Sequence, residues 1–346
     1  MSNEPGGPTA AQPDPPVTVD PSPAGAIDIG RPTPAPGTLA LAVLAAGWLA
    51  AMLWSTREAI SSATAGVTAV SLSAFALPGV ISAALVAGAA VGLAVGEPVA
   101  RRGDRTTLRF VVAVGTGLLV GLLAALAIDL SYAGDTVTRT IAGTTAAAAV
   151  IGGALAGARN GAVVGAVAYA ALVTLLFVVA FSLVRDPLFD LFGAGDSQQS
   201  LVDAASWVSR TESLLAGLVA GVLAFGYLSW ARRRAAHSGT GAELRWPAYL
   251  VAGAGPGLLL LLTEVIIRVG GRSLIDLAAA LSEADAVAQT SLGTTRVDNA
   301  IWVLFVGALT AMVTFGRTLA SPPAEDEASE PDDSGVDEAS TRSAGR

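Results

Sequence analysis

The sequence of 346 residues contains no cysteine and a single histidine, His237. Without cysteine there is no disulfide, no thiolate metal site and no cysteine nucleophile. One histidine excludes a multi-histidine metal site, and its position in an arginine-rich segment argues against a serine–histidine pair. We therefore expect no catalytic residues, no metal site and no cofactor, and we do not expect an enzyme.

Charge is also scarce, because only 14% of the residues are charged while 53% are hydrophobic. Soluble domains carry about 25% charged residues. The acids gather at the ends: residues 1–36 hold four acids and one arginine, and residues 321–346 hold eight acids and two arginines. The net charge of −8 thus belongs to the tails. Lysine is absent, and an all-arginine basic set with abundant alanine, glycine and valine indicates a bacterial gene of high GC content.

Long apolar runs dominate the remaining chain. A helix that crosses a bilayer needs about 20 apolar residues. Eight runs meet this length, at about 38–56, 78–97, 108–129, 138–158, 161–184, 213–231, 247–268 and 298–317. They predict an all-α membrane protein, a polytopic bundle of eight transmembrane helices within residues 37–320. The Pro/Gly-rich tail 1–36 and the acidic tail 321–346 have the composition of disordered segments.

Arginine placement predicts the orientation of the bundle. The links 98–109 and 232–246 each carry four arginines, and Arg159 lies in the turn between the fourth and fifth runs. Arginine-rich short loops remain in the cytoplasm, so both termini are predicted to be cytoplasmic in a plasma-membrane protein. Five of these arginines are expected to hold the topology and contact lipid headgroups: Arg101, Arg102, Arg232, Arg233 and Arg234. A basic cluster beside a bilayer, without interleaved aromatics, does not indicate nucleic-acid binding.

Three segments between the runs are ambiguous. The charge-free stretch 59–77 either extends the second helix beyond Pro78, lies at the outer interface, or re-enters the membrane. A ninth span there would break the arginine pattern. The segments 200–210 and 273–288 are amphipathic, and Ser273 with Asp276 predicts a capping box at the start of the second.

Small residues recur at four-residue spacing in several runs. Because lipid tails are as apolar as leucine, membrane helices associate through close backbone approach at such positions. The main examples are Gly88, Gly92 and Gly96 in the second run and Gly217 and Gly221 in the sixth. They predict tight packing within the bundle, with a homodimer face as the alternative. Around Pro256, three glycines predict a break in the seventh helix.

Two stretches of the chain resemble each other. Leu85-Val86-Ala87-Gly88 is followed by Ala100-Arg101-Arg102, and Leu214-Leu215-Ala216-Gly217 is followed by Ala231-Arg232-Arg233. The pattern predicts two parallel repeats, 38–158 and 161–317, related by about 180° around the membrane normal. The alternative is chance resemblance between helices of low complexity.

Ionisable residues within a span suggest function because they are costly there. Glu264 lies within the seventh run, one turn before Arg268. It forms either an i,i+4 ion pair near the outer interface or a proton or cation site. Asp129 ends the third run at a similar depth and is a candidate partner for Arg139.

The repeat and the expected break at Pro256 favour a transporter- or permease-like protein. Scarce intramembrane charge and abundant packing glycines favour the alternative, a non-transporting scaffold or envelope-assembly subunit. A polar, water-accessible cavity lined by both halves would distinguish the first from the second. The expected partners are the lipid bilayer and either a second copy or another membrane protein.

Overall fold

The computed structural model describes residues 35–61, 66–101, 106–131, 136–158, 160–193, 195, 197–238 and 244–319. Within this part the chain forms ten helices and no strand. They are α1 (Thr38–Ser61), α2 (Gly66–Arg101), α3 (Thr106–Ser131), α4 (Thr136–Ala156), α5 (Gly161–Ser182), α6 (Arg185–Leu191), α7 (Gln198–His237), α8 (Trp246–Gly270), α9 (Arg272–Leu281) and α10 (Glu283–Leu319). The tails expected to be disordered fall almost entirely outside the described residues, as does Arg102.

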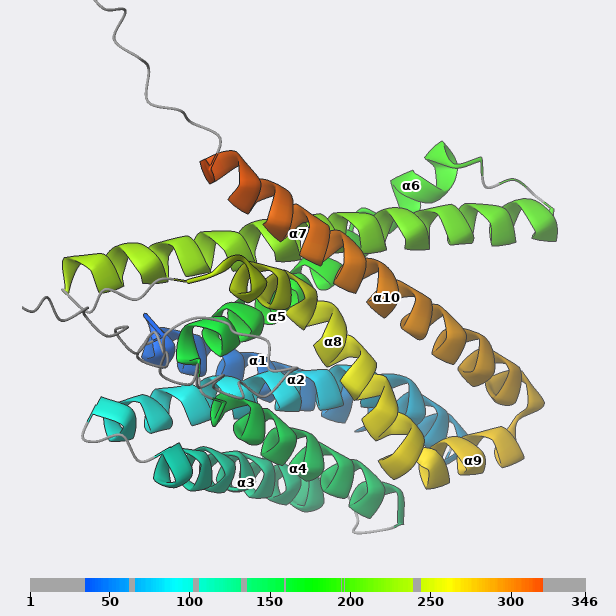
Figure 1. The fold of residues 1–346 in the computed structure, drawn as a ribbon. Coiled ribbons are helices and arrows are strands. Elements are labelled where there is room, and N and C mark those ends of the chain that lie inside the picture. Colours follow the sequence, from blue (N-terminus) through cyan, green and yellow to red (C-terminus); the bar gives the residue numbers. More distant parts are fainter. Residues whose placement is uncertain are drawn as a thin grey trace, which may run out of the picture.

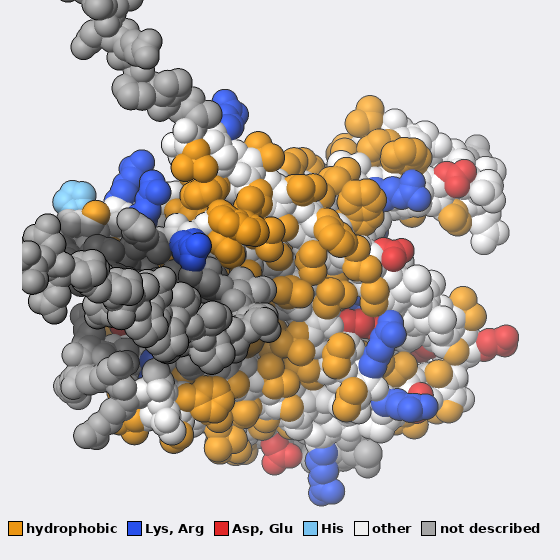
Figure 2. All heavy atoms as spheres, in the orientation of Figure 1, with side chains coloured by type: hydrophobic (Ala, Val, Ile, Leu, Met, Phe, Trp, Pro, Cys, Tyr) orange, Lys and Arg blue, Asp and Glu red, His pale blue; other side chains and the backbone are white. Residues whose placement is uncertain are grey.

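Eight of these helices are long and apolar enough to cross a membrane, namely all except α6 and α9. The predicted all-α polytopic bundle is therefore confirmed. Its sides are apolar: more than half of the surface of Leu122, Leu126, Phe305 and Leu309 is exposed. Figure 2 shows such apolar side chains spread over a broad part of the visible surface. This surface fits a lipid environment, where exposed leucine carries no cost.

The eight spans alternate in direction, so α1 begins on the same face of the bundle on which α10 ends. We name this the proximal face, toward the left in Figure 1, and the opposite face, which carries α6 and α9, the distal face. The cytoplasmic location of the proximal face remains a prediction.

Three helices are much longer than a span. α2 has 36 residues, α7 has 40 and α10 has 37, which corresponds to about 54–60 Å at about 1.5 Å per residue. The hydrocarbon core is about 30 Å thick. α2 passes through Pro78 without interruption, so residues 66–77 extend the second helix, the first of the three alternatives. Residues 59–61 instead form the end of α1. The segment 200–210 is likewise continuous with its span in α7.

The other amphipathic segment, 273–288, is divided between α9 and α10. The capping box predicted there is wrong, because Gly271 is the N-cap of α9 and no side chain caps the helix. Ser273 Oγ lies instead 3.1 Å from Thr140 Oγ1 on α4, and Asp276 pairs with Arg272. The Ser273 hydroxyl, which the sequence spacing predicted to cap α9, thus contacts the neighbouring helix α4 instead.

The predicted break at Pro256 is also wrong, because α8 is one continuous helix. Proline lacks an N–H, so the carbonyl of Ala252 loses its helical partner. The helix is nevertheless held on both sides of this point. A Cβ added at Gly255 would lie 2.3 Å from Val167 of α5, and one at Gly257 would lie 2.4 Å from the Leu304 nitrogen of α10.

The two halves pack in the same internal order. In the first, α2 and α3 both contact α4 around Gly153: a Cβ at Gly92 would lie 3.4 Å from the Gly153 Cα, and one at Gly117 would lie 3.0 Å from it. In the second, α7 and α8 both contact α10 around Gly307, where a Cβ at Gly221 or Gly253 would lie 2.6 or 2.4 Å from the Gly307 oxygen. Each half therefore has one glycine at which three helices meet.

The contacts between the halves are less regular. α2 packs against α5, α8 and α9, and α4 packs against α8 and α9. A rotation of 180° would exchange α2 with α7 and α8 with α3. The contact of α2 with α8 would then have to recur between α7 and α3, and in the described structure α7 and α3 form no comparable contact. The repeat stays a prediction, and the contacts between the halves do not support a two-fold axis.

Candidate functional site

Glu264 lies near the distal end of α8 and accepts hydrogen bonds from two arginines. Its Oε1 accepts from Arg268 Nε at 3.0 Å, and its Oε2 accepts from Arg296 Nε of α10 at 3.0 Å. The Glu264 side chain is 8% exposed, whereas Arg296 is 27% and Arg268 60% exposed. The structure thus contains the i,i+4 pair expected from the sequence, and adds Arg296, which sequence reasoning did not identify.

This arrangement favours a structural role for Glu264. A buried carboxylate is costly unless it is paired and hydrogen-bonded, and charge-assisted bonds are among the stronger ones in proteins. Both carboxylate oxygens of Glu264 already face an arginine, which makes the residue a poor ligand for a further cation. The pair with Arg296 links α8 to α10.

A cavity of about 250 Å³ lies beside this ion pair. It is lined by α5, α7, α8 and α10 of the second half and by Pro78, Gly79 and Ser82 of α2 from the first. Besides Glu264 and Arg296, six polar residues line it: Ser82, Thr174, Glu212, Ser213, Thr263 and Asn299. Both halves thus contribute to one cavity with polar groups in its lining.

Four hydroxyl groups in this lining have their hydrogens engaged within their own helices. Each hydroxyl donates to a backbone carbonyl oxygen three or four residues earlier: Ser82 to Gly79 (3.0 Å), Thr174 to Ala170 (2.7 Å), Ser213 to Ser209 (2.9 Å) and Thr263 to Leu259 (2.9 Å). A hydroxyl that donates in this way keeps its oxygen lone pairs. The four oxygens can therefore act only as acceptors toward anything in the cavity while these bonds persist.

Glu212 of α7 is the unpaired charge of the lining. Within the described residues its carboxylate makes no hydrogen bond and no ion pair, although Arg185 at the start of α6 lies near enough to act on it electrostatically. In the sequence Glu212 is only one of five acids in the link between the fifth and sixth runs. Its position directly before the apolar run at 213 was the signal that it borders the membrane-spanning part.

A separate void of only about 10 Å³ lies next to this cavity. It is lined by Ser82, Thr174 and Thr263, which also line the cavity, and by Pro256. A volume of about 10–15 Å³ is the least that holds one water molecule. α8 runs from the proximal to the distal face, so Pro256 lies on the proximal side of Thr263. The small void is therefore on the proximal side of the cavity.

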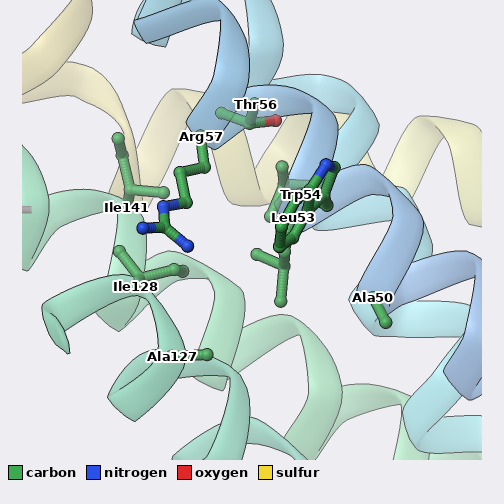
Figure 3. A pocket seen from close by; sticks show the side chains of 9 residues that line it. Ala50, Leu53, Trp54, Thr56, Arg57, Ala127, Ile128 and Ile141 are labelled. Atoms are coloured by element: carbon green, nitrogen blue, oxygen red, sulfur yellow. The ribbon is translucent and has the colours of Figure 1, made fainter. Parts of the chain in front are cut away.

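The first half contains a cavity of about 270 Å³ between α1, α2, α3 and α4, the predicted counterparts of α5, α7, α8 and α10. Figure 3 shows the Arg57 side chain extending from α1 toward Ile128 and Ile141. Its guanidinium carbon also lies 5.7 Å from the Trp54 ring centre. Arg57 is the one charged residue in this lining, so the two cavities differ in chemistry.

The other residues singled out in the sequence lie apart from Glu264. Asp129 is exposed at the end of α3 and forms no ion pair with Arg139 in the described structure. Arg232, Arg233 and Arg234 occupy the last turns of α7 at the proximal face, on which α2 also ends at Arg101. The Arg234 guanidinium carbon lies 5.6 Å from the Trp230 ring centre.

The described residues include no group of three or more histidine, cysteine, aspartate or glutamate side chains that could hold a metal ion. The chemistry of the site is that of an acceptor-rich cavity with one unpaired carboxylate inside a helical membrane bundle. Comparisons of the chain with protein-family models, with curated proteins and with solved structures find no match.

Proposed function

We propose that the protein is a permease-like membrane protein that binds a small solute in the cavity beside Glu212. The observation that carries this proposal is a mainly aliphatic cavity with polar and charged side chains in its lining, formed by α2 of the first half and by four helices of the second. Charged groups within a membrane are costly and are associated with solute and ion pathways. Two hydrogen-bonded arginines explain why Glu264 is tolerated in its buried position, whereas Glu212 has no such partner among the described residues.

The shape of the cavity supports the same proposal. A permease that alternates access has its solute site open toward one face while the other side is closed. Here a cavity of about 250 Å³ lies beside Glu212, and a separate void of only about 10 Å³ lies on its proximal side at Pro256. The Glu264–Arg296 pair would keep α8 and α10 together as one unit during such a change.

The internal packing supports a duplicated origin for the two halves, which we include in the proposal. Gly153 and Gly307 occupy corresponding helices and each lies where three helices meet. Many transporter folds contain such repeats. We further propose that the proximal face is cytoplasmic and that the membrane is the plasma membrane, on the basis of the arginines at that face.

A scaffold remains the second candidate, because one observation favours it. The contacts of α2 with α4 are backbone-to-backbone: a Cβ at Gly88 would lie 2.1 Å from the Ala149 oxygen, and one at Gly152 would lie 2.0 Å from the Leu85 oxygen. Such a solid region suits a protein that holds a second copy or another membrane protein in place.

Cysteine accessibility tests the proposal, because the natural chain has no cysteine to react in the background. The variant Ser82→Cys places one thiol in the cavity, and Leu122→Cys places one on the lipid-facing side of α3, where Leu122 is 58% exposed. Thiols react as thiolates, which form in water and not in lipid. A neutral, water-soluble methanethiosulfonate should modify Ser82→Cys much faster than Leu122→Cys in proteoliposomes. Equal rates would overturn the permease proposal and favour the scaffold.

A further inference from the structure

We infer that the solute of this cavity is a small organic cation, a protonated amine with a short apolar chain, and that the Glu212 carboxylate binds its ammonium group. The inference rests on the proposed function, because it assumes that the cavity admits a solute.

The charges of the lining indicate the sign of the charge on the solute. Glu212, Glu264 and Arg296 line the cavity, and Glu264 and Arg296 neutralise each other at 3.0 Å. Arg268 does not line the cavity, and its side chain is 60% exposed, so water screens its charge. Arg185, which acts on Glu212 electrostatically, is exposed and does not line the cavity either. The charge left facing the cavity is therefore the negative one of Glu212.

The hydrogen-bonding capacity of the lining points the same way. The hydroxyls of Ser82, Thr174, Ser213 and Thr263 present only lone pairs, because each donates to a carbonyl of its own helix. An ammonium group has three donors and no acceptor, whereas a carboxylate has acceptors alone. The donors that remain are the Asn299 amide and the N–H groups of Arg296 other than Nε, which is bound to Glu264. Both of these residues belong to α10. A carboxylate would therefore meet donors only along α10, whereas an ammonium meets acceptors contributed by α2, α5, α7 and α8.

The rest of the lining determines what the ammonium is attached to. Most of it is aliphatic, and it includes Leu175, Val178, Ala216, Leu260, Ile267 and Val303. Hard metal cations require six or more oxygen ligands at once, which one free carboxylate and hydroxyls on separate helices do not supply. A short alkyl chain, by contrast, gains free energy from contact with aliphatic walls.

A matched series of four-carbon compounds tests the inference: n-butylammonium, neutral butyramide and anionic butyrate. Each is added to Ser82→Cys protein during modification by the neutral methanethiosulfonate. We expect n-butylammonium to slow the modification several-fold and the other two to leave its rate nearly unchanged. Protection by butyrate or butyramide that equals or exceeds that of n-butylammonium would overturn the inference.

Second-site variants then test the role of Glu212. Glu212→Gln keeps the size of the side chain and removes its charge, and should abolish the protection by n-butylammonium. Asp203→Asn makes the same change at an exposed position of the same helix and should preserve it. Protection that persists in Glu212→Gln would show that this carboxylate is not the ammonium partner.

A measurement on the Ser82→Cys protein without a second substitution guards against misfolding of the Glu212 variant. The cationic aminoethyl methanethiosulfonate should modify Ser82→Cys faster than the anionic sulfonatoethyl reagent, after correction for their rates with a free thiol. The reverse order would overturn the inference. A thiol that no reagent reaches would instead overturn the proposed function, so the two failures are distinguishable.

Discussion

Replacement of Gly307 in α10 by alanine should destabilise the bundle, because the added methyl group has no space. Its Cβ would lie 2.3 Å from the carbonyl oxygen of Gly253 in α8. The obstructing atom belongs to a helix backbone, so no side-chain rotation relieves the contact, and α8 and α10 must move apart. That movement would weaken the packing of α7 against α10 as well, since a Cβ at Gly221 lies 2.6 Å from the Gly307 oxygen.

The size of the effect follows from a matched control in the same helix. At Gly316 an added Cβ would meet no atom within 4 Å. Alanine is preferred over glycine in a helix by about 1 kcal/mol, and this gain applies to both positions to a similar degree. Overpacking costs about 1–3 kcal/mol. We therefore expect the free energy of unfolding of Gly307→Ala to be about 1–3 kcal/mol lower than that of Gly316→Ala.

The assay is reversible unfolding by sodium dodecyl sulfate in mixed micelles, followed by helical circular dichroism. The midpoint for Gly307→Ala should fall at a lower detergent fraction than that of the natural chain, and the midpoint for Gly316→Ala at an equal or higher one. In the first half, Gly153→Ala and Gly143→Ala form the corresponding pair, because only Gly143 has open space around it. Equal midpoints within both pairs would refute the packing argument.

Two further predictions concern charges and topology. Arg296→Gln should lower the free energy of unfolding by about 1.5–3 kcal/mol, because it removes a hydrogen bond to a largely buried carboxylate. Arg268→Gln should cost about 0–1 kcal/mol because that arginine is exposed. Equal losses in the same unfolding assay would contradict the different burial of the two arginines. In intact cells, Ser197→Cys on the distal face should react with an impermeant thiol reagent and Ser238→Cys on the proximal face should not, and the opposite labelling would reverse the predicted orientation.

Much of the fold could be predicted from the sequence because bilayer thickness imposes a length on every apolar run. The failures occurred where neighbouring helices override a local signal. Pro256 and its glycines predicted a break, but α8 continues through it, with close contacts to α5 and α10 at the neighbouring glycines. The residues 200–210 were predicted to be a separate amphipathic segment, yet they form the first part of α7 and are continuous with its span.

The candidate site was predictable only where its residues are close in sequence. Glu264 and Arg268 lie one turn apart on one helix, so their pairing follows from helical spacing. Arg296 is 32 residues from Glu264 on another helix, and only tertiary packing brings it there. Glu212 was missed for the same reason: in sequence it is one acid among several, and its place in the cavity lining depends on how five helices assemble.

The most direct test of the account asks whether the cavity can be reached from both faces of the membrane. The Ser82→Cys variant is reconstituted in one orientation, and the permanently charged, impermeant trimethylammonioethyl methanethiosulfonate is supplied either outside or inside the vesicles. A permease must open the region around Pro256 during its cycle, so the account predicts modification from both sides, faster from the distal one. Modification from the distal side alone would identify a closed vestibule and contradict the proposed transport function.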